Sequence, residues 1–200
     1  MSSGWDQRFS GEGYHYGTAP ADFVRRQAAR LSPGARVLSV ADGEGRHGAF
    51  LARQGFEVTA FDGSDVALAK ARALAAGQVP QPEFHFCRVE DWHWQPEAFD
   101  AVFGVFIQFA PPSLRAEIFA GIATTLRPGG LVLLHGFATR QIENHSGGPR
   151  DPEHLYTLDL LRAAFAGWQI VDEADYDAVL SEGAGHEGRA ALIDFVARKP

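Results

Sequence analysis

The chain has 200 residues, 46% of them hydrophobic and 12% aromatic, which is typical of one ordered globular domain with a sizeable core. Its formal net charge of −7 argues against nucleic acid as a partner, because phosphate backbones are bound by surplus lysine and arginine. No apolar stretch approaches the ~18 residues of a membrane span, no secretory signal is visible, and the single cysteine excludes an internal disulfide. We therefore expect one cytoplasmic domain over residues 1–200, with neither a nucleic-acid nor a membrane partner.

The N-terminal segment, residues 1–18, is rich in aromatic residues and glycine from Trp5 onward and lacks helical or strand periodicity. Such a segment usually packs against another part of the protein or against a ligand. Two interpretations are equally open, an arm packed on the body of the domain and a lid over a ligand. A helical spacing of apolar residues follows Pro20 and ends at Ser32-Pro33-Gly34.

The segment 37–48 (VLSVADGEGRHG) dominates the organisation of the chain. A buried strand leads into a glycine-rich turn, and a helix begins directly after it. Glycines supply positive φ angles or room for a ligand against the backbone, and the first N–H groups of the helix face the same place. Such a turn binds a nucleotide-like cofactor, but the pattern alone is compatible with NAD, FAD or S-adenosylmethionine (SAM).

Asp62 ends the next predicted strand, 56–61, and is followed by Gly63 and Ser64. Its distance from Gly43 is close to the ~20 residues expected between a glycine turn and a carboxylate that binds ribose. A carboxylate suits that position because it accepts hydrogen bonds from two neighbouring hydroxyls. The alternative is a plain turn or cap residue. A helix follows over 65–76, capped by Ser64 or Asp65.

A third strand is predicted over 84–89, with Cys87 as a small apolar core residue. Asp91 and Trp92 follow the end of this strand. An acid beside a large ring is able to hydrogen-bond an adenine amino group and cover its face, although a surface turn has the same composition.

The second half of the chain continues the alternation of strands and helices. Residues 99–107 form an unbroken apolar run, typical of a strand buried on both faces of a parallel sheet. A helix over 113–126 and a strand over 131–137 follow. The polar segment 138–156 is long enough for a functional, substrate-side loop, and its histidines show no recognisable spacing of metal ligands. A helix over 157–165 and two strands, 168–180 and 189–198, complete the chain, the strands joined as a hairpin.

This order of elements predicts an α/β fold. Alternating strands and helices indicate a Rossmann-like, doubly wound and mostly parallel seven-stranded sheet, and the last two strands indicate an antiparallel C-terminal hairpin. Ligands bind such sheets at the carboxyl ends of the strands, where the strand order reverses. The glycine turn, Asp62, Asp91 and Gln108 all follow predicted strand ends.

On these segments the sequence resembles class I SAM-dependent methyltransferases, and among them the group of tellurite-resistance and thiopurine methyltransferases. The turn 127–130 (RPGG) is typical of the class, and the stretches 5–9 (WDQRF) and 182–189 (EGAGHEGR) are similar to the narrower group. Gln108 and His135 depart from the residues most frequent in that group. The resemblance implies SAM as cofactor and a small-molecule acceptor, with a soft S, Se or Te nucleophile expected.

The resemblance also implies the site residues. Asp42, Gly43 and Gly45 are expected along the methionine part and the sugar, and Asp62, with Gly63 and Ser64, at the ribose. Asp91 and Trp92 are expected at the adenine, and Phe106 and Gln108 near the sulfonium. His186 and Arg189 match a histidine and an arginine that face the substrate in the tellurite-type relatives, and no metal is implied.

SAM carries an activated methyl group, so the protein mainly has to align a nucleophile with it. A general base is needed only for an acceptor that arrives protonated. His186 is the first candidate for that base, and Arg189 or Arg115 for holding an anionic acceptor. Two other functions stay open: an NAD-dependent oxidoreductase, which uses a similar glycine turn, and a SAM-binding protein without catalysis.

Overall fold

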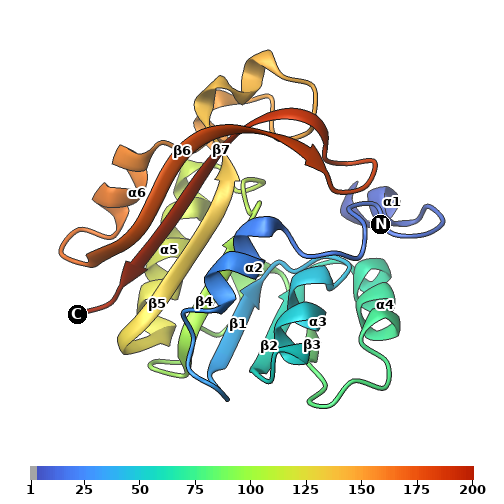
Figure 1. Cartoon of the computed structure of the whole chain (residues 1–200), viewed down its shortest axis with the longest axis horizontal. Helices are drawn as coiled ribbons and strands as arrows, with labels where there is room; N and C mark the ends of the chain where they lie inside the picture. The colour runs from blue at the N-terminus through green and yellow to red at the C-terminus, as the bar shows by residue number, and fades with distance from the viewer. Residues whose placement is uncertain (1–3) are drawn as a thin grey trace. The chain divides into compact units, whose positions relative to one another are not determined.

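The computed structural model describes residues 4–200, which divide into two compact units. We call residues 1–92 together with 182–185 the N-terminal unit, and residues 93–181 together with 186–200 the C-terminal unit. Figure 1 shows the course of the chain through these elements.

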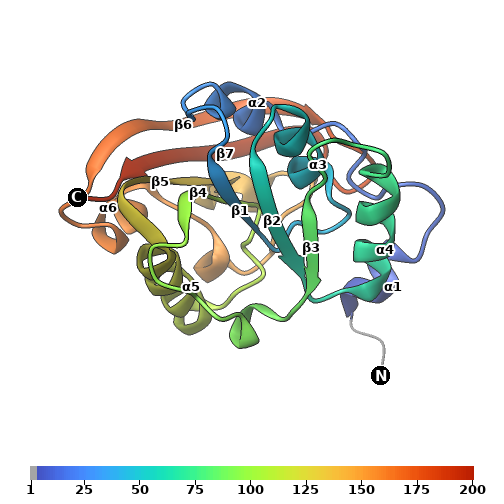
Figure 2. The same ribbon diagram turned by 90° about the horizontal axis from the view of Figure 1, so that it is seen from below.

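The N-terminal unit contains three parallel strands and the helices that join them. The strands pair in the order β3-β2-β1, with Val40 beside Phe61 and Asp62 beside Phe86 (Figure 2). In chain order the elements are α1 (Gly4–Phe9), α2 (Asp22–Ala28), β1 (Arg36–Val40), α3 (Arg46–Arg53), β2 (Glu57–Asp62), α4 (Asp65–Leu74), β3 (Glu83–Phe86) and the 3₁₀ turn η1 (Val89–Asp91).

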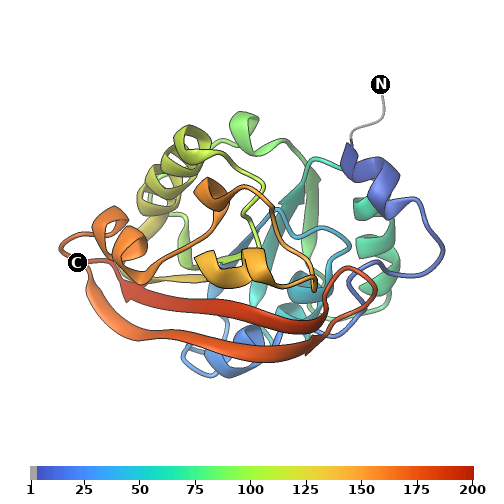
Figure 3. The ribbon, with the colours of Figure 1, turned by 90° about the horizontal axis from the view of Figure 1, so that it is seen from above.

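The C-terminal unit contains a parallel strand pair and a long antiparallel hairpin. β5 runs parallel to β4 and antiparallel to β7, and β7 pairs with β6 along almost its full length (Figure 3). In chain order the elements are β4 (Phe99–Val105), α5 (Pro112–Thr125), β5 (Leu126–Phe137), η2 (Thr139–Glu143), η3 (Pro152–His154), α6 (Leu158–Ala164), β6 (Gln169–Ser181) and β7 (Glu187–Arg198).

The strand order β3-β2-β1-β4-β5-β7-β6 confirms the predicted fold class. The sheet has seven strands, it is mostly parallel, and the β6–β7 hairpin supplies the antiparallel end. β1, β4 and β5 are the strands whose apolar runs were continuous in the sequence, and their central residues are almost fully buried. Because helices cover both faces of a parallel sheet, these strands read as unbroken apolar runs rather than alternating ones.

Several local predictions were wrong, including the start of β5, which lies at Leu126 and not at residue 131. Residues 4–9 form helix α1, although the segment lacks helical periodicity. β3 ends at Phe86, so Cys87 lies beyond the strand and is partly exposed instead of packing in the core. β4 ends at Val105 because Phe106 has a φ of +56°, a left-handed conformation that cannot continue a strand. Across residues 4–200 we find no helix long and apolar enough to cross a membrane.

Candidate active site

The glycine-rich loop between β1 and α3 contains three alternate residues with positive φ angles. Ala41, Gly43 and Gly45 have φ values of 48°, 59° and 84°, and Gly45 is the N-cap of α3. The Asp42 N–H donates to the Phe61 carbonyl of β2, which fixes the loop against the neighbouring strand. The loop therefore turns sharply from the end of a buried strand into a helix N-terminus, as the sequence predicts.

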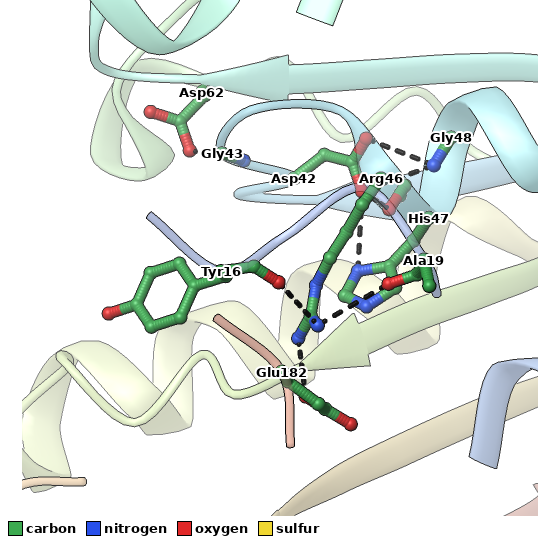
Figure 4. Close-up of polar contacts among 10 residues, drawn as sticks. Tyr16, Ala19, Asp42, Gly43, Arg46, His47, Gly48, Asp62 and Glu182 are labelled. Carbon is green, nitrogen blue, oxygen red and sulfur yellow. Dashed lines mark hydrogen bonds and ion pairs between the residues drawn. The ribbon is translucent and has the colours of Figure 1, made fainter. Parts of the chain in front are cut away.

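Asp42 fixes the start of α3 rather than projecting from the loop. Its carboxylate accepts hydrogen bonds from the Ser39 hydroxyl at 2.7 Å and from the Gly48 N–H at 3.0 Å, and His47 Nδ1 lies 3.6 Å away (Figure 4). A Cβ on Gly48 would lie 2.7 Å from this carboxylate, so the position requires glycine. The pKa of buried His47 is lowered, mainly by desolvation and then by Arg46, so this ring is neutral at physiological pH.

Gly43 and Gly45 have different functions. A Cβ on Gly45 would lie 2.5 Å from the Ala71 Cβ and 2.8 Å from its Cα, so Gly45 is needed for α3 to pack against α4. A Cβ on Gly43 would meet the Phe9 ring only at 3.5 Å, which is ordinary contact. Packing within the protein therefore requires glycine at position 45, whereas steric crowding does not explain Gly43.

Asp62 lies at the end of β2 beside this loop, almost completely buried (Figure 4). Its Oδ2 accepts from the Gly43 N–H and its Oδ1 from the Ser64 N–H, each at 2.9 Å. Burial raises the pKa of this carboxyl to about 6, and Asp42 and Asp6 add to the rise while the two backbone donors oppose it. The structure thus holds a desolvated carboxylate in a fixed orientation next to Gly43.

Gly63 and Ser64 follow Asp62 and connect β2 to α4. The Ser64 hydroxyl caps α4 by accepting from the Ala67 N–H, and it donates to Asp6 Oδ1 at 2.6 Å. A Cβ on Gly63 would make only ordinary contacts, so steric crowding does not explain that glycine. Asp6, which comes from helix α1, brings the N-terminal arm to the predicted ribose position.

Asp91 and Trp92 lie at the turn after β3. The Trp92 indole stacks on the Phe61 ring, with centroids 4.2 Å apart and an interplanar angle of 11°. Its Nε1 is buried and has no hydrogen-bond partner among residues 4–200. Asp91 is exposed in η1. A flat ring fixed on a core phenylalanine, with an exposed carboxylate beside it, suits the edge and face of a purine.

Glu44 anchors the N-terminal arm, and the sequence analysis missed it. This buried carboxylate accepts from the His15 N–H at 2.7 Å and the Tyr16 N–H at 3.4 Å, and it forms an ion pair with Lys70 at 2.9 Å. The only signal in the sequence is an acid inside a glycine-rich loop, which also fits a surface residue. Its partners are 26 to 29 positions away, beyond the reach of any local pattern.

Arg46 connects the start of α3 to the arm and to the tip of the C-terminal hairpin. Its guanidinium forms a buried ion pair with Glu182 at 2.9 Å and donates to the Tyr16 and Ala19 carbonyls (Figure 4). At the hairpin tip, a Cβ on Gly183 would lie 2.5 Å from the His15 carbonyl oxygen. The arm and the hairpin tip are therefore in close backbone contact, joined by Arg46 and by a hydrogen bond from the Gly185 N–H to the His15 carbonyl.

In the C-terminal unit, Phe106 is the centre of a cluster of rings. Its ring centroid lies 4.3 Å from that of His186, 4.7 Å from that of His135 and 4.8 Å from that of Phe137. The left-handed backbone of Phe106 is held by a hydrogen bond from its N–H to the His135 carbonyl, 2.8 Å long. Strained backbone of this kind is frequent at functional sites. We call Phe106, His135, Phe137 and His186 the ring cluster.

Both the nitrogen and the oxygen of the Gln108 side-chain amide form hydrogen bonds with backbone groups. Its Nε2 donates to the Phe137 carbonyl at 2.8 Å and the His154 carbonyl at 3.2 Å, and its Oε1 accepts from the Phe137 N–H at 2.6 Å. His154 Nδ1 in turn lies 3.0 Å from the Gln108 carbonyl. These bonds join the loop 138–156 to the end of β5, and the amide has few hydrogen-bonding positions left for a ligand.

His186 and Arg189 lie in contrasting environments on the hairpin. His186 is buried in the ring cluster, whereas the Arg189 side chain is largely exposed. Arg189 forms an ion pair with Asp177 at 2.8 Å, and Asp177 also pairs with Arg140. Both arginines hold the pKa of Asp177 below its usual value. Within the described part of the chain, no three His, Cys, Asp or Glu side chains are placed to hold a metal ion.

The predicted residues thus form one group in each unit. The N-terminal unit brings together the loop residues, the ribose-position residues and the purine-position residues: Asp42, Gly43, Gly45, Asp62, Gly63, Ser64, Asp91 and Trp92. The C-terminal unit brings Phe106 and His186 into contact, with Gln108 bonded to Phe137 of the same cluster and Arg189 directed to Asp177.

Residues 37–130, which include the glycine-rich loop and Asp62, match the family model of the methyltransferase domain. This segment is therefore similar to a methyltransferase domain, and it makes up slightly less than half of the chain. The match starts in β1 and ends at the RPGG turn, and it includes most of the segments that carry the resemblance in the sequence. The glycine turn lies inside the segment that is similar to methyltransferases, which favours a methyltransferase over the oxidoreductase alternative.

Two methyltransferases are similar in sequence to this protein over about half of its length. An uncharacterized methyltransferase of Synechocystis sp. is 31% identical over 105 residues, 52% of this chain and 48% of that protein. A ubiquinone biosynthesis O-methyltransferase of Xanthomonas campestris pv. campestris is 36% identical over 110 residues, 54% of this chain and 45% of that protein. The chain therefore spans about half the length of the curated relatives it matches.

The similarity of this fold to a solved structure extends beyond residues 37–130. TehB from Haemophilus influenzae superposes with a TM-score of 0.75 over 98% of this chain and 67% of that one, at 17% identity. At this identity the likeness concerns the fold alone.

The residues of the methyltransferase domain fit SAM. Asp62 presents a desolvated carboxylate that retains acceptor positions for ribose hydroxyls, and the backbone of Gly43 adjoins it. The buried, unpartnered Nε1 of Trp92 is a donor that an adenine nitrogen would satisfy. SAM would supply an activated methyl group when bound, and Asp62, Gly43 and Trp92 would hold its nucleoside.

Proposed function

We propose that this protein transfers the methyl group of SAM to a small-molecule acceptor, with a soft S, Se or Te nucleophile as the first candidate. Among methyltransferases we place it near the tellurite-resistance and thiopurine group. We also retain the prediction of a single functional domain in the cytoplasm, with residues 1–18 covering the cofactor and residues 138–156 on the acceptor side.

The observation that carries the proposal is the environment of Asp62. An aspartate that served only as a turn residue would gain nothing from burial, because desolvation of its charge is unfavourable. Here two backbone N–H groups fix the carboxylate beside Gly43, and Asp42 and Asp6 add further negative charge nearby. A bound nucleoside with two hydroxyl donors and the positive charge of SAM would compensate that cost.

The position of the arm supports a cover over the cofactor. Asp6 bonds to Ser64, Phe9 lies next to Gly43, and the backbone of His15 is bonded to Glu44. These contacts place the arm on the same loop and strand end that hold the predicted cofactor residues. An arm packed elsewhere on the domain would leave those positions to solvent.

The ring cluster supports a soft acceptor. Phe106, Phe137 and His186 offer aromatic surfaces, and a polarizable sulfur or selenium atom makes favourable contacts with aromatic rings. We assign His186 to contact with the acceptor, and Arg189 to an anionic group on it. Arg189 would have to exchange its ion pair with Asp177 for that contact.

The test is release of S-adenosylhomocysteine from SAM across a panel of acceptors. The panel contains tellurite, selenite, aliphatic and aromatic thiols, a thiopurine and a catechol. We expect turnover with a soft nucleophile, and turnover with the catechol alone would contradict the proposed acceptor class. Absence of SAM binding in a titration would contradict the proposed function itself.

A non-catalytic SAM-binding protein is the second candidate, and Gln108 favours it. The amide of Gln108 is engaged with backbone groups at three positions and so offers little to a reacting acceptor. SAM binding without turnover on any acceptor would support that function.

A further inference from the structure

The N-terminal arm has a rear part, residues 14–19, that is fixed to the N-terminal unit by buried charged side chains. The Glu44 carboxylate accepts from two backbone N–H groups of this part, and the Arg46 guanidinium donates to two of its carbonyls (Figure 4). Glu44 and Arg46 are 4% and 5% exposed. Because moving residues 14–19 would leave these desolvated charges with fewer partners, the rear part stays in place.

The front part of the arm is α1, which rests on predicted cofactor residues. Phe9, 3% exposed, places its ring 3.5 Å from the position that a Cβ on Gly43 would occupy. Asp6 accepts a hydrogen bond from the Ser64 hydroxyl at 2.6 Å, next to the Ser64 N–H that donates to Asp62. One face of Gly43 is thus covered by an aromatic ring, and a ligand reaches that face only after Phe9 has moved.

Residues 10–13 separate the two parts and have the properties of a hinge. All four are exposed, and a Cβ on Gly11 or Gly13 would have no atom within 4 Å apart from its neighbours along the chain. The Gly11 carbonyl accepts from Lys70 Nζ at 2.9 Å, a bond whose donor lies at the end of a flexible side chain. An unpacked segment with two glycines is able to change direction without disturbing the core.

Contacts of Arg8 and Phe9 join α1 to the rear part of the arm. Arg8 donates to the Tyr16 hydroxyl at 3.3 Å in an exposed hydrogen bond, and the Phe9 ring makes an edge contact with the Tyr16 ring. Within α1, Trp5 stacks on Phe9 with centroids 5.8 Å apart. Water replaces an exposed hydrogen bond at little cost, whereas the buried charges under the rear part have no such substitute. α1 is therefore the part of the arm that detaches more easily.

We propose that α1 is a gate for the cofactor, which opens at residues 10–13 and closes with the Phe9 ring on Gly43. This rests on the proposed function and goes beyond a fixed cover, because the movement of α1 becomes a step of cofactor entry and of product release. A gate that closes equally well over an empty and a filled site slows entry and release by the same factor and leaves Kd unchanged. The gate thus sets how fast the cofactor exchanges, and Asp62 sets how tightly it binds.

Phe9→Ala removes the ring that closes the gate. In stopped-flow binding we expect the association and dissociation rate constants of SAM to rise by at least about tenfold each, with Kd changed by less than about threefold. Gln7→Ala, at an exposed position of the same helix, is the matched control that should change neither rate constant. A rise of the dissociation rate constant alone would make Phe9 an ordinary cofactor contact and would overturn the proposal, as would two unchanged rate constants.

The two glycines of the hinge test it without any change at the site. Gly13 has a φ of +71°, which alanine adopts only with strain, whereas Gly11 has no positive φ. Gly13→Ala should therefore favour the open arm and raise both rate constants by about fivefold or more. Gly11→Ala is its matched control and should change them by less than about twofold. Equal effects of the two substitutions would contradict a hinge at this place.

Hydrogen exchange in the unliganded protein locates the hinge independently of SAM. We expect the Phe9 amide to exchange at least ~10²-fold faster than the His15 amide, whose acceptor is the buried Glu44 carboxylate. Equal exchange at Phe9 and His15 would mean that the arm moves as one body and would overturn the proposal. If wild type binds no SAM, the proposed function and the gate fail together, whereas SAM binding with rate constants unchanged in Phe9→Ala overturns the gate alone.

Discussion

Arg46 and Glu182 form a buried ion pair, 2.9 Å long, between residues 136 positions apart in the sequence. The pair joins the helix that begins after the glycine-rich loop to the tip of the last hairpin. Because Arg46 also donates to the Tyr16 and Ala19 carbonyls, the same guanidinium fixes the N-terminal arm.

We expect Arg46→Ala to lower the free energy of unfolding by about 3 kcal/mol, because the largely buried Glu182 side chain loses the charge of Arg46. The double variant with Glu182→Ala should lose less than the sum of the single losses. Urea unfolding gives the free energies of unfolding of wild type, the two single variants and the double variant. Arg25→Ala, which removes an exposed ion pair, is the control. Additive losses would mean that the two residues are not coupled.

The glycines of the loop should separate stability from cofactor binding. Gly45→Ala forces a Cβ against Ala71 at a positive φ, so we expect a loss of stability of at least ~3 kcal/mol. Gly43→Ala should cost only about 1–2 kcal/mol, from its φ angle, but lower SAM affinity at least tenfold. Thermal unfolding and a binding titration on both variants test this. Equal effects of the two substitutions on stability would contradict the assignment.

Asp62→Ala should weaken SAM binding by about 1–3 kcal/mol, because the ribose hydroxyls lose their acceptor. In wild type, affinity should be constant above pH 6 and fall below it, since the pKa of Asp62 is raised to about 6 and the protonated carboxyl accepts poorly. Isothermal titration between pH 5 and 8 measures both effects. An Asp62→Ala affinity equal to wild type would remove Asp62 from the site.

The same raised pKa has an opposite consequence for the stability of the unliganded protein. Because the pKa in the folded state is higher than the ordinary 3.8, protonation favours the folded state. The contribution of Asp62 to the free energy of unfolding therefore falls as the pH rises from about 4 to 6. The difference between wild type and Asp62→Ala in urea unfolding across this range should show that slope.

His186→Phe should lower turnover at least tenfold and leave SAM affinity within a factor of about two. The phenyl ring preserves packing against Phe106 and Phe137 but cannot hydrogen-bond an acceptor. Steady-state kinetics with a SAM titration on the same preparation gives both values. A parallel loss of affinity and turnover would indicate that His186 is structural.

Arg189→Ala should leave the unfolding midpoint unchanged, because its ion pair with Asp177 is exposed. If Arg189 holds an anionic acceptor, KM for that acceptor rises while KM for a neutral thiol stays the same. Asp177→Ala serves as the control, since it frees Arg189 without removing it. Identical KM values for both acceptors in Arg189→Ala would exclude the arginine from substrate binding.

The fold was predictable because apolar runs and glycine turns are local signals. The buried strand β1 and the hairpin appear in the sequence at nearly their observed bounds, whereas β4 ends at Val105 instead of 107 and β5 begins at Leu126 instead of 131. β3 was predicted too long, because the residues after Phe86 have the composition of a strand but no pairing partner continues with them. Hydrophobic periodicity indicates which residues are apolar, whereas the length of a paired strand depends on how far the neighbouring strand continues beside it.

The site was predictable only where its residues follow strand ends. Asp62 and Gly43 could be located from spacing alone, and the structure joins them by a hydrogen bond. Glu44 and Arg46 were missed because their partners lie in the arm and the hairpin tip, far away in sequence. The packing function of Gly45 was missed for the same reason, since Ala71 belongs to a different helix.

The bond between Arg46 and Glu182 also bears on the synthesis of the chain. The glycine-rich loop is synthesised before the carboxylate that neutralises its arginine, which follows 136 residues later. Until then the guanidinium stays hydrated, and the loop lacks one of the contacts that hold its shape. We therefore expect the nascent protein to complete the proposed cofactor site only after the β6–β7 hairpin has been made.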